Sequence, residues 1–131
     1  MEKNLILLID DDENICKVIK LYLEKEGWDV ALAHDGITGL KEFQKKTPDL
    51  VLLDIMMPGI DGMQVCKKIR EKSDAIGIIM LSAKSQEMDK ISCLMSGADD
   101  YITKPFSISE LIARVDAVCR RVSRSSSKPG E

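Results

Sequence analysis

Carboxylate side chains follow two apolar runs of the sequence, at the point where each run ends. Asp54 comes after the mainly apolar run over residues 49–53 and before a Pro-Gly turn, and Asp10 and Asp11 come directly after the run over residues 5–9. Short unbroken apolar runs are typical of strands buried on both faces of a parallel sheet, and open parallel sheets bind ligands at the carboxyl ends of their strands. The three carboxylates are therefore expected to meet at one edge of a sheet and to form a cation site.

Two further polar side chains follow later predicted strands. Ser82 follows the apolar run over residues 77–81, and Lys104 follows residues 100–103. Carboxylates in contact raise one another's pKa, and a divalent cation removes that conflict. Ligation by oxygen alone favours Mg²⁺, which keeps several waters and so leaves room for phosphate oxygens. Lys104 would add a point charge for a phosphate, and Ser82 a hydroxyl donor.

These residue types together indicate phosphoryl transfer onto a carboxylate, in which a metal and a lysine disperse the charge on the phosphoryl oxygens. Asp54 is the expected nucleophile, because it alone follows a central strand and precedes a tight turn. Each part has a simpler interpretation: residues 10–12 as helix-capping acids, and Lys104-Pro105 as an ordinary turn. These polar residues follow four of the predicted strands, one set after each strand, and this arrangement favours a phosphoryl-transfer site.

The composition restricts the class of protein. At 131 residues, with 44% hydrophobic and 31% charged residues, the chain has the size and composition of one soluble globular domain. Its net charge of -3 gives no reason to expect that this segment binds nucleic acid by itself. No apolar run reaches the ~18 residues of a membrane span, and acids at 10–13 interrupt the run that a signal peptide would need. A cytoplasmic protein without a membrane partner is expected.

The cysteines and the histidine are not spaced as a metal site. Cys16, Cys66, Cys93 and Cys119 form no Cys-x-x-Cys pair, and each falls within a helix-like segment. We therefore expect buried, reduced thiols. His34 is the only histidine of the sequence and lacks partners for a metal site, which predicts no specific role for it.

Apolar runs alternate with amphipathic stretches along the chain, which predicts a three-layer α/β sandwich built from five strand–helix units. The expected strands cover residues 4–9, 28–33, 49–53, 77–81 and 100–103. The expected helices lie between Asp12 and Gly27 and over residues 36–46, 62–71, 86–96 and 107–121.

Two segments carry more specific expectations. The helix over 36–46 is expected to bury Ile37, Leu40 and Phe43. The Ser-rich tail over 123–131 is expected to be a flexible linker.

Four segments carry the motifs of a known protein family. They are Leu8-Ile9-Asp10-Asp11-Asp12, Asp54–Gly62, Met80-Leu81-Ser82-Ala83 and Gly97–Phe106. Through them, residues 3–122 resemble the receiver domain of bacterial two-component response regulators. The resemblance implies a doubly wound, five-stranded parallel sheet in the order 2-1-3-4-5 with five flanking helices, the flavodoxin-like or CheY-like arrangement. Residues 1–122 would then be the receiver domain.

The resemblance also implies roles for the acids. Asp54 would accept a phosphoryl group from the phosphohistidine of a sensor histidine kinase. Asp11 and Asp54 would bind Mg²⁺ directly, together with the backbone carbonyl of Met56, and Asp10 would bind it through water. The protein would not be an enzyme in the usual sense, since it would catalyse only its own phosphorylation and dephosphorylation.

The other site residues would bind the phosphoryl group and transmit its presence. Ser82 and Lys104 would contact the phosphoryl oxygens, and a cis peptide between Lys104 and Pro105 would orient the lysine. Ser82 would then move toward the phosphoryl group, and Tyr101 would turn inward to fill the space left behind, a shift between two existing states. Ser82 stands where threonine is commoner in the family, so the hydroxyl donor is kept and a methyl group is lost.

The last two predicted strand–helix units match a surface of the winged-helix (OmpR/PhoB-type) regulators, which dimerise through helix 4, strand 5 and helix 5. The match implies a homodimer after phosphorylation, in which each cation faces an acid of the other copy. Solvated surface charge is the alternative interpretation, since exposed ion pairs contribute only ~0–1 kcal/mol. The residues of this predicted dimer face are Lys90, Ile91, Leu94, Asp99, Asp100, Glu110, Ile112, Arg114 and Arg121.

The resemblance predicts transcription regulation through a DNA-binding domain that follows the linker over 123–131, so DNA would be contacted only by that domain. A stand-alone receiver that relays phosphate or docks on a partner would have the same site, and the reading frame beyond Glu131 distinguishes the two. A Mg²⁺-dependent phosphatase with a nucleophilic aspartate is a further alternative. Such enzymes usually carry a second acid two residues after the nucleophile, where this sequence has Met56.

Overall fold

Strands and helices alternate along the whole described part of the chain. The structure is a computed structural model, and it describes residues 4–83 and 87–127. The strands are β1 (Leu5–Ile9), β2 (Asp29–Ala33), β3 (Leu50–Asp54), β4 (Gly77–Ser82) and β5 (Asp100–Thr103). The helices are α1 (Glu13–Lys25), α2 (Gly36–Lys46), α3 (Gly62–Lys72), α4 (Glu87–Met95) and α5 (Ile108–Ser127). Each predicted element is present close to its expected residues. The largest difference is at the end of α5, which lies beyond the predicted end at residue 121.

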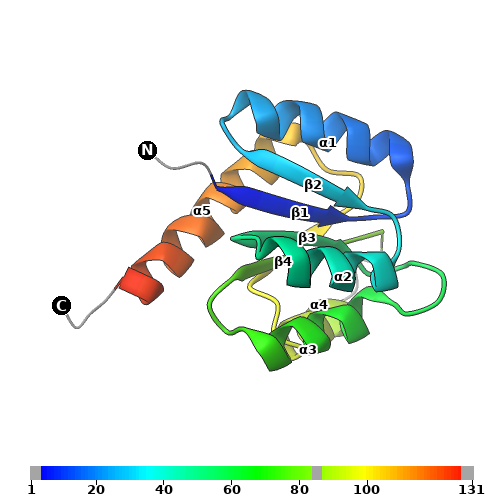
Figure 1. The fold of residues 1–131 in the computed structure, drawn as a ribbon. Helices are drawn as coiled ribbons and strands as arrows, with labels where there is room; N and C mark the ends of the chain where they lie inside the picture. Colours follow the sequence, from blue (N-terminus) through cyan, green and yellow to red (C-terminus); the bar gives the residue numbers. More distant parts are fainter. Residues whose placement is uncertain (1–3, 84–86, 128–131) are drawn as a thin grey trace.

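The strands form one parallel sheet in the order β2-β1-β3-β4-β5 (Figure 1), which confirms the predicted order. In the register of the sheet, Ile9 of β1 pairs with Ala33 of β2 on one side and with Leu53 of β3 on the other. Because neighbouring strands are parallel, their carboxyl ends meet at one edge of the sheet. The residues that follow β1, β3, β4 and β5 are therefore brought together there.

Helices cover both faces of the sheet (Figure 1), and the side chains beneath them form two buried clusters. Helices α2, α3 and α4 pack on one face, where Phe43, Val65 and Cys93 join the first cluster. Helices α1 and α5 pack on the other face, where Ile19 and Leu111 join the second cluster. Every residue of β3 is buried, as expected for a central strand covered on both sides. This strand is a firmly packed base for the residue at its end.

Helix α2 packs against the sheet through glycines and not through Ile37. Ile37 is 54% exposed, so the prediction that it is buried is wrong. Gly36 and Gly39 are buried in its place, and a Cβ atom at Gly39 would collide with the Ile9 side chain of β1. The helix backbone thus lies close to the sheet, and Ile37 falls on the outer side. Phe43 is buried, as predicted.

Helix α5 continues to Ser127, beyond its predicted end at residue 121. The Ser-rich composition of residues 123–127 indicated a linker, but no glycine or proline interrupts the chain before Pro129, so nothing stops the helix there. The rest of the predicted linker, residues 128–131, lies outside the described residues. Neither α5 nor any other helix in the described part of the chain is long and apolar enough to cross a membrane.

The cysteines are thiols held in helices. Cys16, Cys66 and Cys93 are buried, Cys119 is partly buried, and all four are free. Burial raises the pKa of the Cys66 thiol to about 11. Burial, followed by the charge of Asp10, raises the pKa of the Cys16 thiol to about 12. Both thiols therefore stay protonated at neutral pH, and a protonated thiol is a weak nucleophile.

Candidate functional site

Three carboxylates meet at the edge of the sheet where β1 and β3 end. Asp54 is the last residue of β3, and Asp10 and Asp11 follow β1, which lies beside β3. One oxygen of each carboxylate lies within 4.8 Å of the others. Asp10 is fully buried and Asp54 is 4% exposed, whereas Asp11 is exposed. The cluster is therefore accessible to solvent on the side of Asp11.

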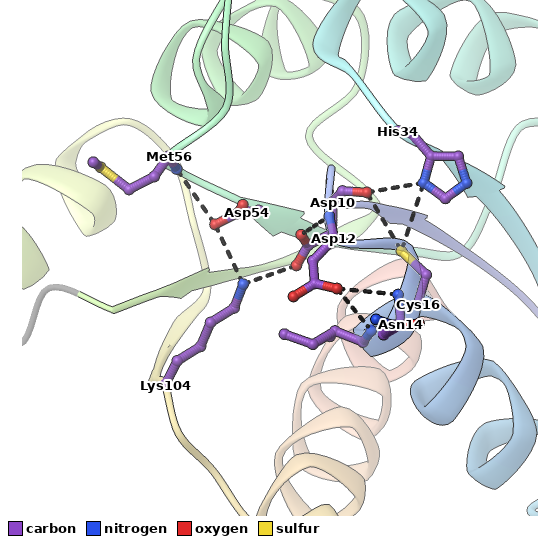
Figure 2. Close-up of polar contacts among 9 residues, drawn as sticks. Asp10, Asp12, Asn14, Cys16, His34, Asp54, Met56 and Lys104 are labelled. Carbon is purple, nitrogen blue, oxygen red and sulfur yellow. Dashed lines mark hydrogen bonds and ion pairs between the residues drawn. The ribbon is translucent and has the colours of Figure 1, made fainter.

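Lys104 places its ammonium group against the same carboxylates (Figure 2). The Lys104 Nζ donates to Asp10 Oδ2 at 2.9 Å and lies 3.7 Å from Asp54 Oδ1. The backbone N–H of Lys104 donates to the Ser82 carbonyl at 2.7 Å, and the peptide bond between Lys104 and Pro105 is cis. Burial opposes the charge of Lys104, but the hydrogen bond to Asp10 and the nearby carboxylates outweigh burial and raise its pKa. Lys104 is therefore protonated at neutral pH.

The surroundings of Asp54 disfavour the ionised form of its carboxyl group. Burial, followed by the charge of Asp10, raises the pKa of Asp54 to about 7. Lys104 and the Met56 N–H, which donates to Asp54 Oδ1 at 3.3 Å, act in the opposite direction without cancelling this effect. A divalent cation would supply the missing compensation, and a set of carboxylate oxygens is the donor set that suits Mg²⁺. The residues present therefore fit a magnesium ion held by Asp10, Asp11 and Asp54.

Three other residues occupy their predicted places, and their roles stay predictions. Ser82 ends β4 and is fully buried; because Leu81 pairs with Asp54 in the sheet, Ser82 lies one residue further along the neighbouring strand. Tyr101 is 8% exposed and packs in the first core cluster, so its ring already lies inward in this structure. The Met56 side chain is 54% exposed, and its carbonyl is the predicted additional metal ligand.

The loop after Asp54 brings α3 against the backbone of Asp54 itself. The Gly62 N–H donates to the Ile55 carbonyl at 3.1 Å, and Asp61 caps α3 by accepting from the Gln64 N–H at 3.0 Å. A Cβ atom at Gly62 would collide with the Asp54 carbonyl oxygen. Sequence reasoning gave Gly62 no role of its own. The Asp-Gly pair at the start of the predicted helix could have indicated this close approach, because glycine has no Cβ atom to prevent it.

Charged residues of the predicted dimer face pair within the chain. Arg114 Nη1 lies 3.1 Å from Asp100 Oδ1, and Arg114 Nε lies 3.1 Å from Glu110 Oε2. The Asp99 carboxylate is held elsewhere, because its Oδ2 accepts from Arg70 Nη2 at 2.9 Å. Asp100, Glu110 and Arg114 are therefore brought together on one surface, while the Asp99 side chain belongs to a separate ion pair.

The remaining residues of that face lie on α4 and α5. Ile91 and Leu94 on α4 are 43% and 49% exposed, and Ile112 on α5 is partly buried against the second core cluster. Arg121 donates to a backbone carbonyl at 3.3 Å. The Lys90 side chain lies outside the described part of the structure. Ile91 and Leu94 are three residues apart on a helix and so form an exposed apolar strip.

Comparisons with known proteins identify the family. The sequence model of the response regulator receiver domain matches residues 6–116. The chain is similar to the solved receiver domain of Francisella response regulator 1452, with 39% identity and a TM-score of 0.86 over 91% of this chain and 98% of that one. It is also similar to the BeF3-activated N-terminal receiver domain of Klebsiella pneumoniae RstA, with 36% identity and a TM-score of 0.83 over 89% of this chain and 99% of that one.

A putative response regulator from Chloroflexus aurantiacus shows 34% identity and a TM-score of 0.87, over 92% of this chain and 100% of that one. The chain therefore belongs to the family of response regulator receiver domains. It is the receiver domain of a two-component response regulator, with the CheY-like flavodoxin fold. Receiver domains in general accept a phosphoryl group and bind Mg²⁺ at an acidic pocket, which corresponds here to the cluster of three aspartates.

Addition of Mg²⁺ should raise the midpoint of thermal unfolding by roughly 10 °C at a concentration about 100-fold above its Kd. The ion would relieve the charge conflict between the clustered carboxylates, which exists only in the folded protein. Asp11→Asn should lose most of this increase, because it removes one of the three carboxylates that would bind the ion. The variant should still fold, because Asp11 is exposed and its replacement leaves the core unchanged. Asp74→Asn, which changes an exposed carboxylate outside the site, should keep it. Scanning fluorimetry measures both, and a full increase in Asp11→Asn would contradict the site.

Proposed function

We propose that Asp54 is the phosphoacceptor and takes its phosphoryl group from the phosphohistidine of a sensor histidine kinase. The observation that carries the proposal is the environment of this one carboxylate. It ends the central strand β3, its Oδ1 lies 3.7 Å from Lys104 Nζ, and Asp10 and Asp11 lie beside it. The proposed nucleophile, a cation for the phosphoryl oxygens and two proposed metal ligands thus lie together at one edge of the sheet.

The hydrogen bonds of the cluster favour Asp54 over Asp10 as the nucleophile. Asp10 Oδ1 accepts from the Asp12 N–H at 2.9 Å, and Asp10 Oδ2 accepts from Lys104 Nζ at 2.9 Å. Both oxygens of Asp10 are therefore engaged, and its side chain is fully buried. Among the described residues, Asp54 has only the longer contacts to Met56 and Lys104, both on Oδ1. An oxygen of Asp54 can approach phosphorus without breaking a short hydrogen bond.

In the proposed reaction, an Asp54 oxygen attacks phosphorus while the bond between phosphorus and the histidine nitrogen breaks. The imidazole leaves with the electron pair of that bond and takes up a proton. Lys104 would bind a phosphoryl oxygen through Nζ, and the Ser82 hydroxyl would donate to another. Magnesium, held by Asp10, Asp11, Asp54 and the Met56 carbonyl, would disperse the charge of the phosphoryl group. Hydrolysis of the acyl phosphate would restore the starting state, so no other substrate would be turned over.

Transfer from a phosphorylated histidine-kinase fragment tests this reaction. The phosphoryl group should appear on the chain in the presence of Mg²⁺ and should fail to appear in the presence of EDTA. The product should be destroyed by hydroxylamine, because an acyl phosphate is cleaved by this nucleophile and a phosphoserine is not. A product that survives hydroxylamine would contradict the assignment to a carboxylate.

Phosphorylation would then act on the predicted dimer face through Ser82 and Tyr101. An acyl phosphate adds negative charge and acceptor oxygens at the end of β3, and Ser82 gains a hydrogen bond by moving toward them. Tyr101 lies on β5 opposite Met80 of β4, so a shift at the end of β4 is passed to its neighbour strand. The phosphoryl group needs only to bias an existing equilibrium between two arrangements.

A homodimer would bury the exposed apolar strip of α4. Treatment with beryllofluoride, which mimics the phosphoryl group, should convert the protein from monomer to dimer in sedimentation. Leu94→Asp should weaken this dimer by about tenfold or more, because it places a charge in an apolar contact. Leu21→Asp is the matched control, since Leu21 is 52% exposed on α1, which covers the other face of the sheet. A treated wild-type protein that stays monomeric at high concentration would contradict this part of the proposal.

The proposed output is control of transcription in the cytoplasm through a winged-helix DNA-binding domain. The RstA structure is described as the N-terminal receiver domain of its protein, which supports a domain arrangement of this kind. The net charge of -3 supports DNA contact by that other domain only. The parent reading frame tests the idea: a winged-helix sequence after Glu131 is expected, and its absence would favour a stand-alone receiver that relays phosphate or docks on a partner.

A further inference from the structure

His34, for which no specific role was predicted, lies against the backbone of a predicted metal ligand. His34 directly follows β2, and its Nδ1 lies 3.0 Å from the carbonyl oxygen of Asp10. The thiol of Cys16, in the first turns of α1, donates to the same oxygen at 3.4 Å. Figure 2 shows the ring and the sulfur both directed at this one oxygen. Two side chains from two different elements therefore hold one carbonyl group.

The chemistry of the acceptor determines which nitrogen of His34 carries a proton. A carbonyl oxygen can only accept, so Nδ1 must be the donor. Both the Nδ1–H tautomer of neutral histidine and the imidazolium ion carry that proton. The bond to Asp10 is thus available whether or not His34 is charged.

The Asp10 carbonyl belongs to the peptide that joins Asp10 to Asp11. The other polar atoms of Asp10 are also fixed, since its N–H donates to the Ala33 carbonyl at 3.0 Å and its carboxylate binds Lys104. Asp11 is different, because within the described residues no hydrogen bond or ion pair to its carboxylate is found. The position of the Asp11 carboxylate therefore depends on the orientation of the peptide that precedes it. That peptide is the one His34 holds.

We propose that His34 is a positioning residue of the magnesium and phosphoacceptor site, acting through the Asp10–Asp11 peptide, with Cys16 as a second donor to the same oxygen. The inference rests on the proposed function. Groups that orient metal ligands without binding the metal typically change metal affinity by about 10- to 100-fold when they are removed. His34 lies one step further from the ion, so an effect near the lower limit is expected.

Substitutions that remove the donor of His34, keep it in place or move it outward test this role. His34→Leu should weaken Mg²⁺ binding by roughly tenfold, measured by calorimetry well below the unfolding temperature. His34→Asn should restore the affinity to within about twofold, because its Nδ2 is as many bonds from Cα as Nδ1 of histidine. His34→Gln places its donor one bond further out and should not restore it. A purely structural role would lower the unfolding temperature of all three variants and leave the Mg²⁺ affinity of the folded proteins unchanged.

A second readout does not depend on Mg²⁺ or activity. Nitrogen NMR of the only histidine should show a proton on Nδ1 of neutral His34, and a neutral ring protonated on Nε2 alone would overturn the proposal. If His34→Leu bound Mg²⁺ with the wild-type affinity, the positioning role would be overturned as well. The proposed function would remain intact in that case, provided that the wild type binds Mg²⁺ and is phosphorylated. Conversely, a wild type that binds no Mg²⁺ would refute the proposed function, and with it the positioning role.

Discussion

Replacement of Asp54 by asparagine should abolish phosphorylation by a small phosphodonor in the presence of Mg²⁺. The amide that replaces the carboxylate is neutral and cannot form an acyl phosphate, so a loss on the order of 10³-fold or more is expected. The fold should survive, because asparagine has the size of aspartate and its amide can still accept from the Met56 N–H, which donates to Asp54 Oδ1 at 3.3 Å. Incorporation of labelled phosphate measures the result.

Asp61→Asn is the matched control for this experiment. Asp61 lies in the same loop and caps α3 through the Gln64 N–H, and asparagine is an equally good capping residue. The control should therefore incorporate phosphate at the wild-type level. Normal labelling of Asp54→Asn, or an equal loss in both variants, would remove the basis for Asp54 as the acceptor.

The same Asp54→Asn substitution should stabilise the protein in the absence of divalent cations. Burial and the charge of Asp10 raise the pKa of Asp54 from 3.8 to about 7, so its ionised form is disfavoured in the folded protein. Each pKa unit corresponds to about 1.4 kcal/mol, so a rise of roughly three units predicts a gain in the free energy of unfolding on the order of 4 kcal/mol at pH 8. Urea unfolding in EDTA measures it.

The pH dependence of this gain follows from the direction of the pKa change. Below about pH 4 the carboxyl is neutral in both states, so the substitution should have little effect on unfolding. As pH rises through the window from about 4 to 7, Asp54 ionises in the unfolded chain but not in the folded protein, which favours unfolding of the wild type. The advantage of the variant should therefore grow across this window and stay constant above it. Saturating Mg²⁺ should reduce the advantage, and a gain independent of pH would contradict the account.

The positions of the site residues could be predicted from the sequence because a parallel sheet brings strand ends together. The apolar run before Asp54 and the run before Asp10 are both typical of a strand covered on both faces. Their carboxylates then had to meet at one edge, and they lie within 4.8 Å of one another. The lysine, the aspartate at the end of the central strand and the turn after it could therefore be found from residue order alone.

Features that depend on packing between elements could not be predicted in this way. Ile37 lies outward because helix α2 turns Gly39 toward the sheet. A larger residue at Gly39 would collide with Ile9, which is distant in the sequence. His34 reaches the Asp10 carbonyl only because β2 lies beside β1. The intrachain pairs of Arg114 likewise depend on how α5 lies against β5, whereas the sequence showed only matching charges.

Identification of the phosphorylated residue would show directly whether Asp54 is the phosphoacceptor. The wild-type protein would be phosphorylated in Mg²⁺, reduced with borohydride to mark the acyl phosphate, digested and sequenced by mass spectrometry. We expect a single modified residue, Asp54, which ends β3 beside Lys104. Modification of Asp10, Asp11 or any other residue in place of Asp54 would contradict this expectation.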